Sequence, residues 1–197
     1  QANSQELFFA GGLLNYQISV ENTLLRQPER HLLINSYATI DIGNFFAAPQ
    51  GRFLSAQGGV RAEWHPGSSD QDLVLYSQFR AGKIGGEIPF DELFILGLER
   101  DNELWIRGLV ATYNRKPGSG LLGRGYLLFN GGCENRVYRN PFFTISVGPF
   151  LDSGRSYDQN GVFGAPSWHW NTGFMIKTRV YNGLTVDLIL GRDFQSS

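Results

Sequence analysis

Residues Gly86 to Leu109 read GEIPFDELFILGLERDNELWIRGL, and this segment differs from the rest of the chain. Elsewhere, apolar and polar residues alternate in runs separated by turn residues, as they do in β-strands. Pro89 lacks a backbone donor and fixes φ, which argues against a central strand. Connections of this length are uncommon and are usually functional or disordered. The residues allow two interpretations: a loop over 84–109 that packs inward with Arg107 near its tip, or a short helix over 89–96 followed by a strand.

The composition favours one all-β domain. The 197 residues suit a single domain or part of a larger one. Charged residues make up 18% of the chain, below the usual quarter, whereas glycine occurs 25 times and aromatic residues reach 14%. A formal charge of −1 gives no bulk electrostatic reason to expect nucleic-acid binding. Cys133 is the single cysteine, so an internal disulfide framework is excluded.

Period-two alternation predicts about eight strands of roughly 10–14 residues in hairpin order, and no amphipathic helix. The predicted strands are 8–21, 32–43, 54–65, 73–82, 121–130, 143–152, 168–180 and 184–191. Residues 22–30, 131–141 and 153–167 are predicted to be connections because they are polar or rich in turn residues. Strands of this length exceed the average of about 5–6 residues in globular proteins.

One face of these predicted strands carries polar residues at mid-strand positions. They are Arg61, Glu63, Gln78, Arg80, Lys177, Arg179 and Asp187. Such charges are costly in a dry interior but cost little beside a hydrated lumen. The opposite apolar face would then meet lipid, with Trp64, Trp168, Trp170 and Tyr181 as an aromatic girdle. A soluble antiparallel sheet with one wet face shows the same alternation, so periodicity leaves both interpretations open.

Two motifs add a resemblance to this pattern. The segment EIPFDELFILG over residues 87–97 is followed by Ile106-Arg107-Gly108-Leu109. Together they resemble the loop of the bacterial surface antigen family, which includes BamA, TamA and the two-partner secretion transporters. In that family a long extracellular loop folds back into the barrel lumen and ends in a hydrophobic-Arg-Gly-aromatic tip. The resemblance implies a functional loop motif and a set of loop anchors, with Leu109 in place of the aromatic residue. The motif is Ile106, Arg107 and Gly108, and the anchors are Pro89, Phe90 and Gly97.

The second motif is Phe150-Leu151-Asp152-Ser153-Gly154. It resembles an aromatic-x-Asp-x-Gly motif on the barrel wall of the same family. The resemblance implies that Phe150, Asp152 and Gly154 are the wall partner of the loop, with Asp152 opposite Arg107. This pairing is physically reasonable because a guanidinium offers two parallel donors to a carboxylate. The family also tends to have a glutamate on the strand after the loop, and residues 127–130 (LLFN) lack it.

The resemblance covers roughly residues 73–194 and implies a transmembrane β-barrel in the bacterial outer membrane. Family barrels have about sixteen strands, so residues 1–197 are expected to form a single barrel domain that is about half of the complete one. A self-contained eight-stranded barrel is the alternative. The implied activity is the insertion or translocation of proteins. The implied partners are outer-membrane lipids, unfolded outer-membrane or secreted proteins, and accessory lipoproteins, with no nucleic acid.

No enzyme site is expected from the residues. The acidic residues of the loop read as solvated side chains, and the three histidines lie on separate segments without metal-ligand spacing. Cys133 sits in a predicted turn without a neighbouring histidine pattern. We therefore expect no catalytic residue, no metal and no cofactor. Two other functions stay open: the barrel domain of a patatin-like outer-membrane phospholipase, which would need a Gly-x-Ser-x-Gly motif upstream, and a soluble ligand-binding β-barrel.

Overall fold

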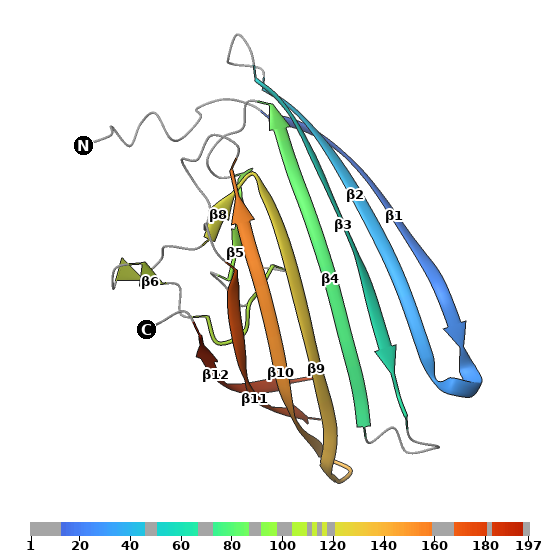
Figure 1. Cartoon of the computed structure of the whole chain (residues 1–197). Coiled ribbons are helices and arrows are strands. Elements are labelled where there is room, and N and C mark those ends of the chain that lie inside the picture. Colours follow the sequence, from blue (N-terminus) through green and yellow to red (C-terminus); the bar gives the residue numbers. More distant parts are fainter. Residues whose placement is uncertain are drawn as a thin grey trace.

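A computed structural model describes residues 13–45, 51–66, 73–86, 92–97, 104–109, 112–113, 116–117, 121–158, 168–180 and 183–194. The chain is all-β, and its long strands form one antiparallel sheet of eight strands, as predicted. These strands are β1 (Leu13–Gln27), β2 (Leu32–Phe45), β3 (Arg52–Trp64), β4 (Leu73–Gly86), β9 (Gly125–Arg139), β10 (Phe143–Tyr157), β11 (His169–Val180) and β12 (Thr185–Asp193). They pair in that order as one curved layer (Figure 1). Within the described residues, β1 and β12 are the two edges of the sheet and do not pair.

Short elements complete the structure. A 3-10 turn, η2 (Pro28–Arg30), joins β1 to β2. Between β4 and β9, β5 (Phe94–Leu96) pairs with β8 (Leu121–Gly123), and β6 (Thr112–Tyr113) pairs with β7 (Lys116–Pro117). Residues 94–96 are therefore extended, which contradicts the alternative of a helix over 89–96 at its C-terminal end. No helix in the described ranges is long and apolar enough to cross a membrane.

Several strands run further than predicted. β1 continues past residue 21 to Gln27 and accommodates a register shift between Thr23 and Leu25. β9 extends to Arg139 through a segment predicted to be a connection, and β10 extends to Tyr157. β4 includes residues 84–86, so the predicted loop begins later than residue 84. The polar segments stay extended because neighbouring strands satisfy their backbone groups.

The register places one continuous row of polar residues on a single face of the sheet. We call this row the polar rung, and it is polar on every strand. From β1 to β12 it consists of Thr23, Asn35, Arg61, Gln78, Asn130, Asp152, Asn171 and Asp193. Residues that lie opposite each other in a ladder share a face. We call this side the loop face, because the segment between β4 and β9 packs on it, and we call the other side the outer face.

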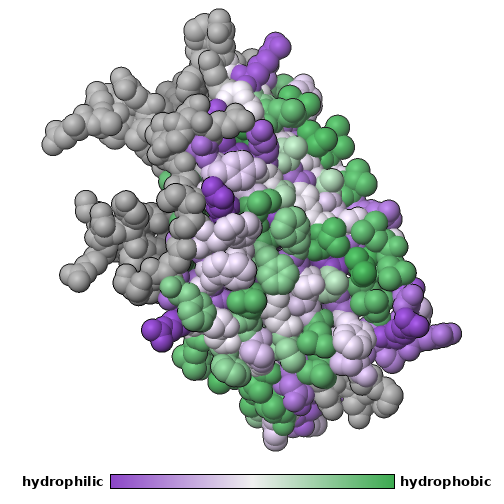
Figure 2. All heavy atoms as spheres, in the orientation of Figure 1, coloured by the Kyte–Doolittle hydropathy of each residue, from purple (hydrophilic) through white to green (hydrophobic). Residues whose placement is uncertain are grey.

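The outer face is apolar and exposed. Its exposed side chains include Ile18, Val20, Ile40, Val60, Phe79, Phe174, Leu188 and Leu190. Exposure reaches 62% for Ile18 on one edge strand and 61% for Leu190 on the other. Figure 2 shows apolar side chains spread over the long strands. A soluble monomer rarely exposes a contiguous apolar patch larger than a few hundred Å², so this face is a candidate interaction surface.

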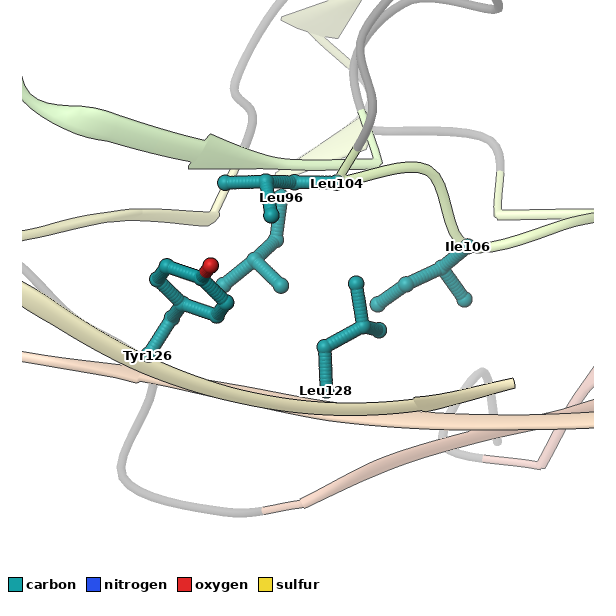
Figure 3. Packing of buried hydrophobic residues seen from close by; sticks show 5 residues of the cluster. All are labelled: Leu96, Leu104, Ile106, Tyr126 and Leu128. Atoms are coloured by element: carbon teal, nitrogen blue, oxygen red, sulfur yellow. The ribbon is translucent and has the colours of Figure 1, made fainter. Parts of the chain in front are cut away.

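The buried core lies on the loop face, between the loop and β9. Leu96, Leu104 and Ile106 from the loop point toward Tyr126 and Leu128 of β9 (Figure 3). Leu96, Ile106, Tyr126 and Leu128 are completely buried. Phe94 packs edge-on against Tyr126, with ring centroids 4.7 Å apart. Burying such side chains contributes about 1.5–3 kcal/mol each, so the loop is held on the sheet by apolar contacts as well as by its polar tip.

Candidate functional site

The loop tip is a tight turn from Ile106 to Leu109. The Leu109 N–H donates to the Ile106 carbonyl at 3.3 Å, which closes a four-residue turn. Gly108, the third residue of this turn, has φ +73°. A turn with positive φ at that position favours glycine because a Cβ atom would be strained there. The Arg-Gly order therefore has a local cause: Gly108 makes the turn and Arg107 projects from it.

Arg107 binds Asp152 of β10 through two parallel hydrogen bonds. Its Nε donates to Asp152 Oδ2 at 2.9 Å, and its Nη2 donates to Oδ1 at 2.6 Å. The backbone N–H of Arg107 also donates to Asp152 Oδ2, at 2.7 Å. Bidentate arginine–carboxylate pairs fix orientation as well as distance. Asp152 therefore holds both the side chain and the backbone of the tip residue.

Groups on the neighbouring strands accept hydrogen bonds from the remaining donors of the guanidinium. Nη2 donates to the Gly131 carbonyl of β9 at 2.9 Å, and Nη1 donates to the Tyr76 hydroxyl of β4. The guanidinium carbon lies 4.5 Å from the centroid of the Phe150 ring and 5.5 Å from that of Tyr76. Both distances suit a cation–π contact. Three strands thus converge on a single side chain.

The ion pair is almost fully removed from solvent. Arg107 is 6% exposed and Asp152 is completely buried. Burial alone would lower the pKa of Arg107, but the hydrogen bonds and negative charge of Asp152 outweigh it and raise that pKa above its ordinary value. The guanidinium is therefore a fixed positive charge. Taking both charges out of water is costly, and the many hydrogen bonds offset that cost.

The spacing of Phe150, Asp152 and Gly154 follows from strand geometry. Residues two apart on a strand point to the same face, and all three lie on the loop face of β10. Phe150 contributes its ring and Asp152 its carboxylate, as described above. Gly154 leaves space, because a Cβ atom there would lie 2.7 Å from Ile106 Cδ1. The structure thus brings the expected wall motif against the expected tip.

Gly97 and Leu109 meet at the base of the tip. The Gly97 N–H donates to the Leu104 carbonyl at 3.0 Å. Gly97 has φ +77°, and a Cβ atom there would lie 2.4 Å from Leu109 Cδ2. Leu109 packs over this glycine and against the buried core between the loop and β9. The other predicted anchors, Pro89 and Phe90, lie outside the described residues.

Two asparagines belong to the site although no sequence pattern singled them out. Asn130 of β9 accepts from Arg80 Nη2 at 2.8 Å and donates to the Trp105 carbonyl at 3.1 Å. It thus holds the loop from the first long strand after it. Asn171 of β11 donates to the Arg107 carbonyl at 3.2 Å. Both belong to the polar rung beside Asp152, so knowledge of the register would have identified them.

The rest of the loop face is polar and open. A hollow of about 500 Å³ lies below the tip, lined by residues of both charges. Lys177 forms an ion pair with Glu134, and Glu63 binds both Arg61, at 3.4 Å, and His65, at 2.8 Å. The described residues contain no group of acidic, histidine or cysteine side chains able to hold a metal ion. These contacts suit a surface in contact with water.

Comparison of the chain with protein-family models, curated proteins and solved structures gives no significant match in any of the three.

Proposed function

We propose that this chain is barrel wall from an outer-membrane protein that inserts or translocates other proteins, of the bacterial surface antigen type. The observation that carries the proposal is the Arg107–Asp152 contact, because it joins two motifs that are distant in sequence. A guanidinium held by a carboxylate, a hydroxyl and a carbonyl is a costly arrangement for a surface loop. Such an arrangement suits a loop that braces a wide interior.

The two faces of the sheet support a location in a membrane. A soluble ligand-binding barrel would place apolar side chains inside and polar ones outside, whereas this sheet has its polar rung on the loop face and exposes Val60 and Leu188 on the other. Lipid would cover the outer face, and water would fill the space around the loop. Further strands would complete the wall beyond β1 and β12.

The proposed mechanism forms and breaks no covalent bond. The Arg107 loop fixes the shape of the lumen, while an exposed strand edge of the complete barrel templates incoming strands through backbone pairing. The substrates are unfolded outer-membrane or secreted proteins, and the remaining partners are membrane lipids and accessory lipoproteins. The loop is therefore a structural brace rather than a catalytic element.

The first test is circular dichroism of the chain refolded with and without detergent micelles. A β spectrum that forms only in micelles is expected, because the outer face needs an apolar solvent. A cooperative β fold in plain buffer would overturn the membrane assignment. In the full-length protein, Arg107→Ala is then expected to impair assembly activity and to expose the loop to proteases. Activity and protease protection equal to the wild type would contradict the brace.

A further inference from the structure

The loop tip also contacts the last two strands of the sheet. Asn171 of β11 is completely buried, and its Nδ2 donates to the Arg107 carbonyl. In the ladder between β10 and β11 it lies directly opposite Asp152. Asp152 holds the N–H and side chain of Arg107, and Asn171 holds the carbonyl of the same residue. Asp152 and Asn171, two neighbouring residues of the polar rung, therefore bind the backbone N–H and the carbonyl of Arg107, respectively.

Gly108 and Gly191 of β12 approach each other backbone to backbone. A Cβ atom at Gly191 would lie 2.9 Å from the Gly108 Cα and 3.1 Å from Phe150 Cζ. A Cβ atom at Gly108 would lie 2.9 Å from the Gly191 Cα. Real Cβ atoms do not approach a backbone so closely, so a side chain at either position would push the turn away from β12. Gly191 has no positive φ, so its need for glycine comes from its close contacts with Gly108 and Phe150.

We infer that Asn171 and Gly191 are positioning residues for the loop tip. They set the distance of the Arg-Gly turn from β11 and β12 and its position along these strands. The Nε and Nη2 donors of Arg107 both reach Asp152 only when the turn lies at this distance from the strands. The tip consequently couples the edge strand β12 to the ion pair on β10. The importance of this coupling for assembly rests on the proposed function, whereas the positioning itself is a property of the folded chain.

The test measures hydrogen exchange at the Arg107 amide, which donates to Asp152 Oδ2. Asn171→Leu keeps about the size of the side chain but removes the donor to the Arg107 carbonyl, and it adds no charge opposite Asp152. Gly191→Ala inserts a methyl group between the turn and β12. Each substitution is expected to accelerate exchange at this amide about tenfold, the effect of one lost hydrogen bond, and to leave the amides of β1 and β2 unchanged.

Two matched controls separate positioning from general damage. Thr172→Val removes a side-chain hydrogen bond from the next residue of β11, but to the Phe150 carbonyl rather than to the loop. Gly85→Ala adds a methyl group where nothing lies within 4 Å. Exchange at Arg107 that matches these controls in both test variants would overturn the inference. If Gly191→Ala fails to fold, the uncharged and nearly isosteric Asn171→Leu still decides the question.

The exchange experiment is independent of assembly activity. Faster exchange at the Arg107 amide in the Asn171 and Gly191 variants, without loss of assembly activity, would support the positioning role and count against the proposed function of the loop. Unchanged exchange in the Asn171 and Gly191 variants would overturn the positioning role. If Arg107→Ala still impaired assembly, the proposed role of the loop as a brace would stand. The two proposals can therefore fail separately.

Discussion

Arg107 uses all of its side-chain nitrogens, and this sets it apart from a lysine at the same place. Nε and Nη2 bind Asp152, Nη2 also reaches the Gly131 carbonyl, and Nη1 binds the Tyr76 hydroxyl. A lysine ammonium is a point charge that cannot match this planar set of acceptors. Arg107→Lys is therefore expected to lower the free energy of unfolding by about 1.5–3 kcal/mol, the value of hydrogen bonds to charged groups. Denaturant unfolding in micelles measures the change.

Removing the charge altogether is expected to cost more. Arg107→Ala leaves Asp152 buried without its counter-ion, and breaking a buried pair typically costs about 3–5 kcal/mol. Adding Asp152→Asn should return part of that loss, since the unpaired charge disappears. Arg179→Lys, on an exposed side chain of β11, is the control and should change little. Equal stability of Arg107→Ala and the wild type would show that the pair does not hold the loop.

At the residue scale, the sequence allowed only part of this site to be predicted. Ile106, Arg107, Phe150 and Asp152 were selected because they resemble known motifs. Tyr76, Asn130 and Asn171 were not, since each is an ordinary polar residue on an alternating strand. Their importance depends on register, and a slip of one residue would turn each of them to the outer face. Register is a tertiary property that one strand's sequence does not contain.

At the scale of single strands, two glycines of β10 make different demands. A Cβ atom at Gly148 would lie 1.6 Å from the Cys133 carbonyl oxygen of β9, which is fixed backbone. At Gly154 the nearest atoms are the ends of the Ile106 and Leu128 side chains, which can move. Gly148→Ala is therefore expected to destabilise the sheet by about 3 kcal/mol or more, and Gly154→Ala by about 1 kcal/mol.

Thermal or denaturant unfolding of the two alanine variants checks this order. The comparison is matched because both changes add one methyl group to the same strand. Gly85→Ala, which meets open space, gives the baseline for β-strand glycines. A smaller loss for Gly148→Ala than for Gly154→Ala would contradict the close approach of β9 and β10.

Strand ends were harder to predict than strand positions. Residues 131–139 of β9 are rich in polar and small side chains, and such composition usually marks a turn. Residues 131–135 stay extended because β9 pairs there with β4 on one side and β10 on the other, and the strand continues to Arg139 through its pairing with β10. On a sheet with one hydrated face, polar residues no longer signal the end of a strand. β10 continues past Asp152 to Tyr157 because it pairs with β9 along this whole length and with β11 as far as Gly154.

For the whole molecule, period-two alternation was enough to predict a long antiparallel sheet with one polar face. It did not show that the outer face stays uncovered across all the strands, because exposure depends on what packs against a face. Among the described residues, apolar side chains of that face are exposed on strands from β1 to β12, while the loop and its core occupy the other face. The outer face and the loop face thus lie on opposite sides of one layer. A substitution on the outer face should therefore leave the packing of the loop unchanged.

Arginine substitutions test this separation. Val60→Arg and Leu188→Arg place a charge on the outer face of β3 and β12, where the wild-type side chains are 40% and 52% exposed. If lipid covers that face, each is expected to oppose membrane insertion by roughly 2–4 kcal/mol near the bilayer centre. Thr39→Arg on the loop face of β2 is the control, because its side chain would project into water. Insertion yield into lipid vesicles is the measurement. Normal insertion of both outer-face variants, or equal losses in all three, would reject the assignment of the faces and with it the membrane location.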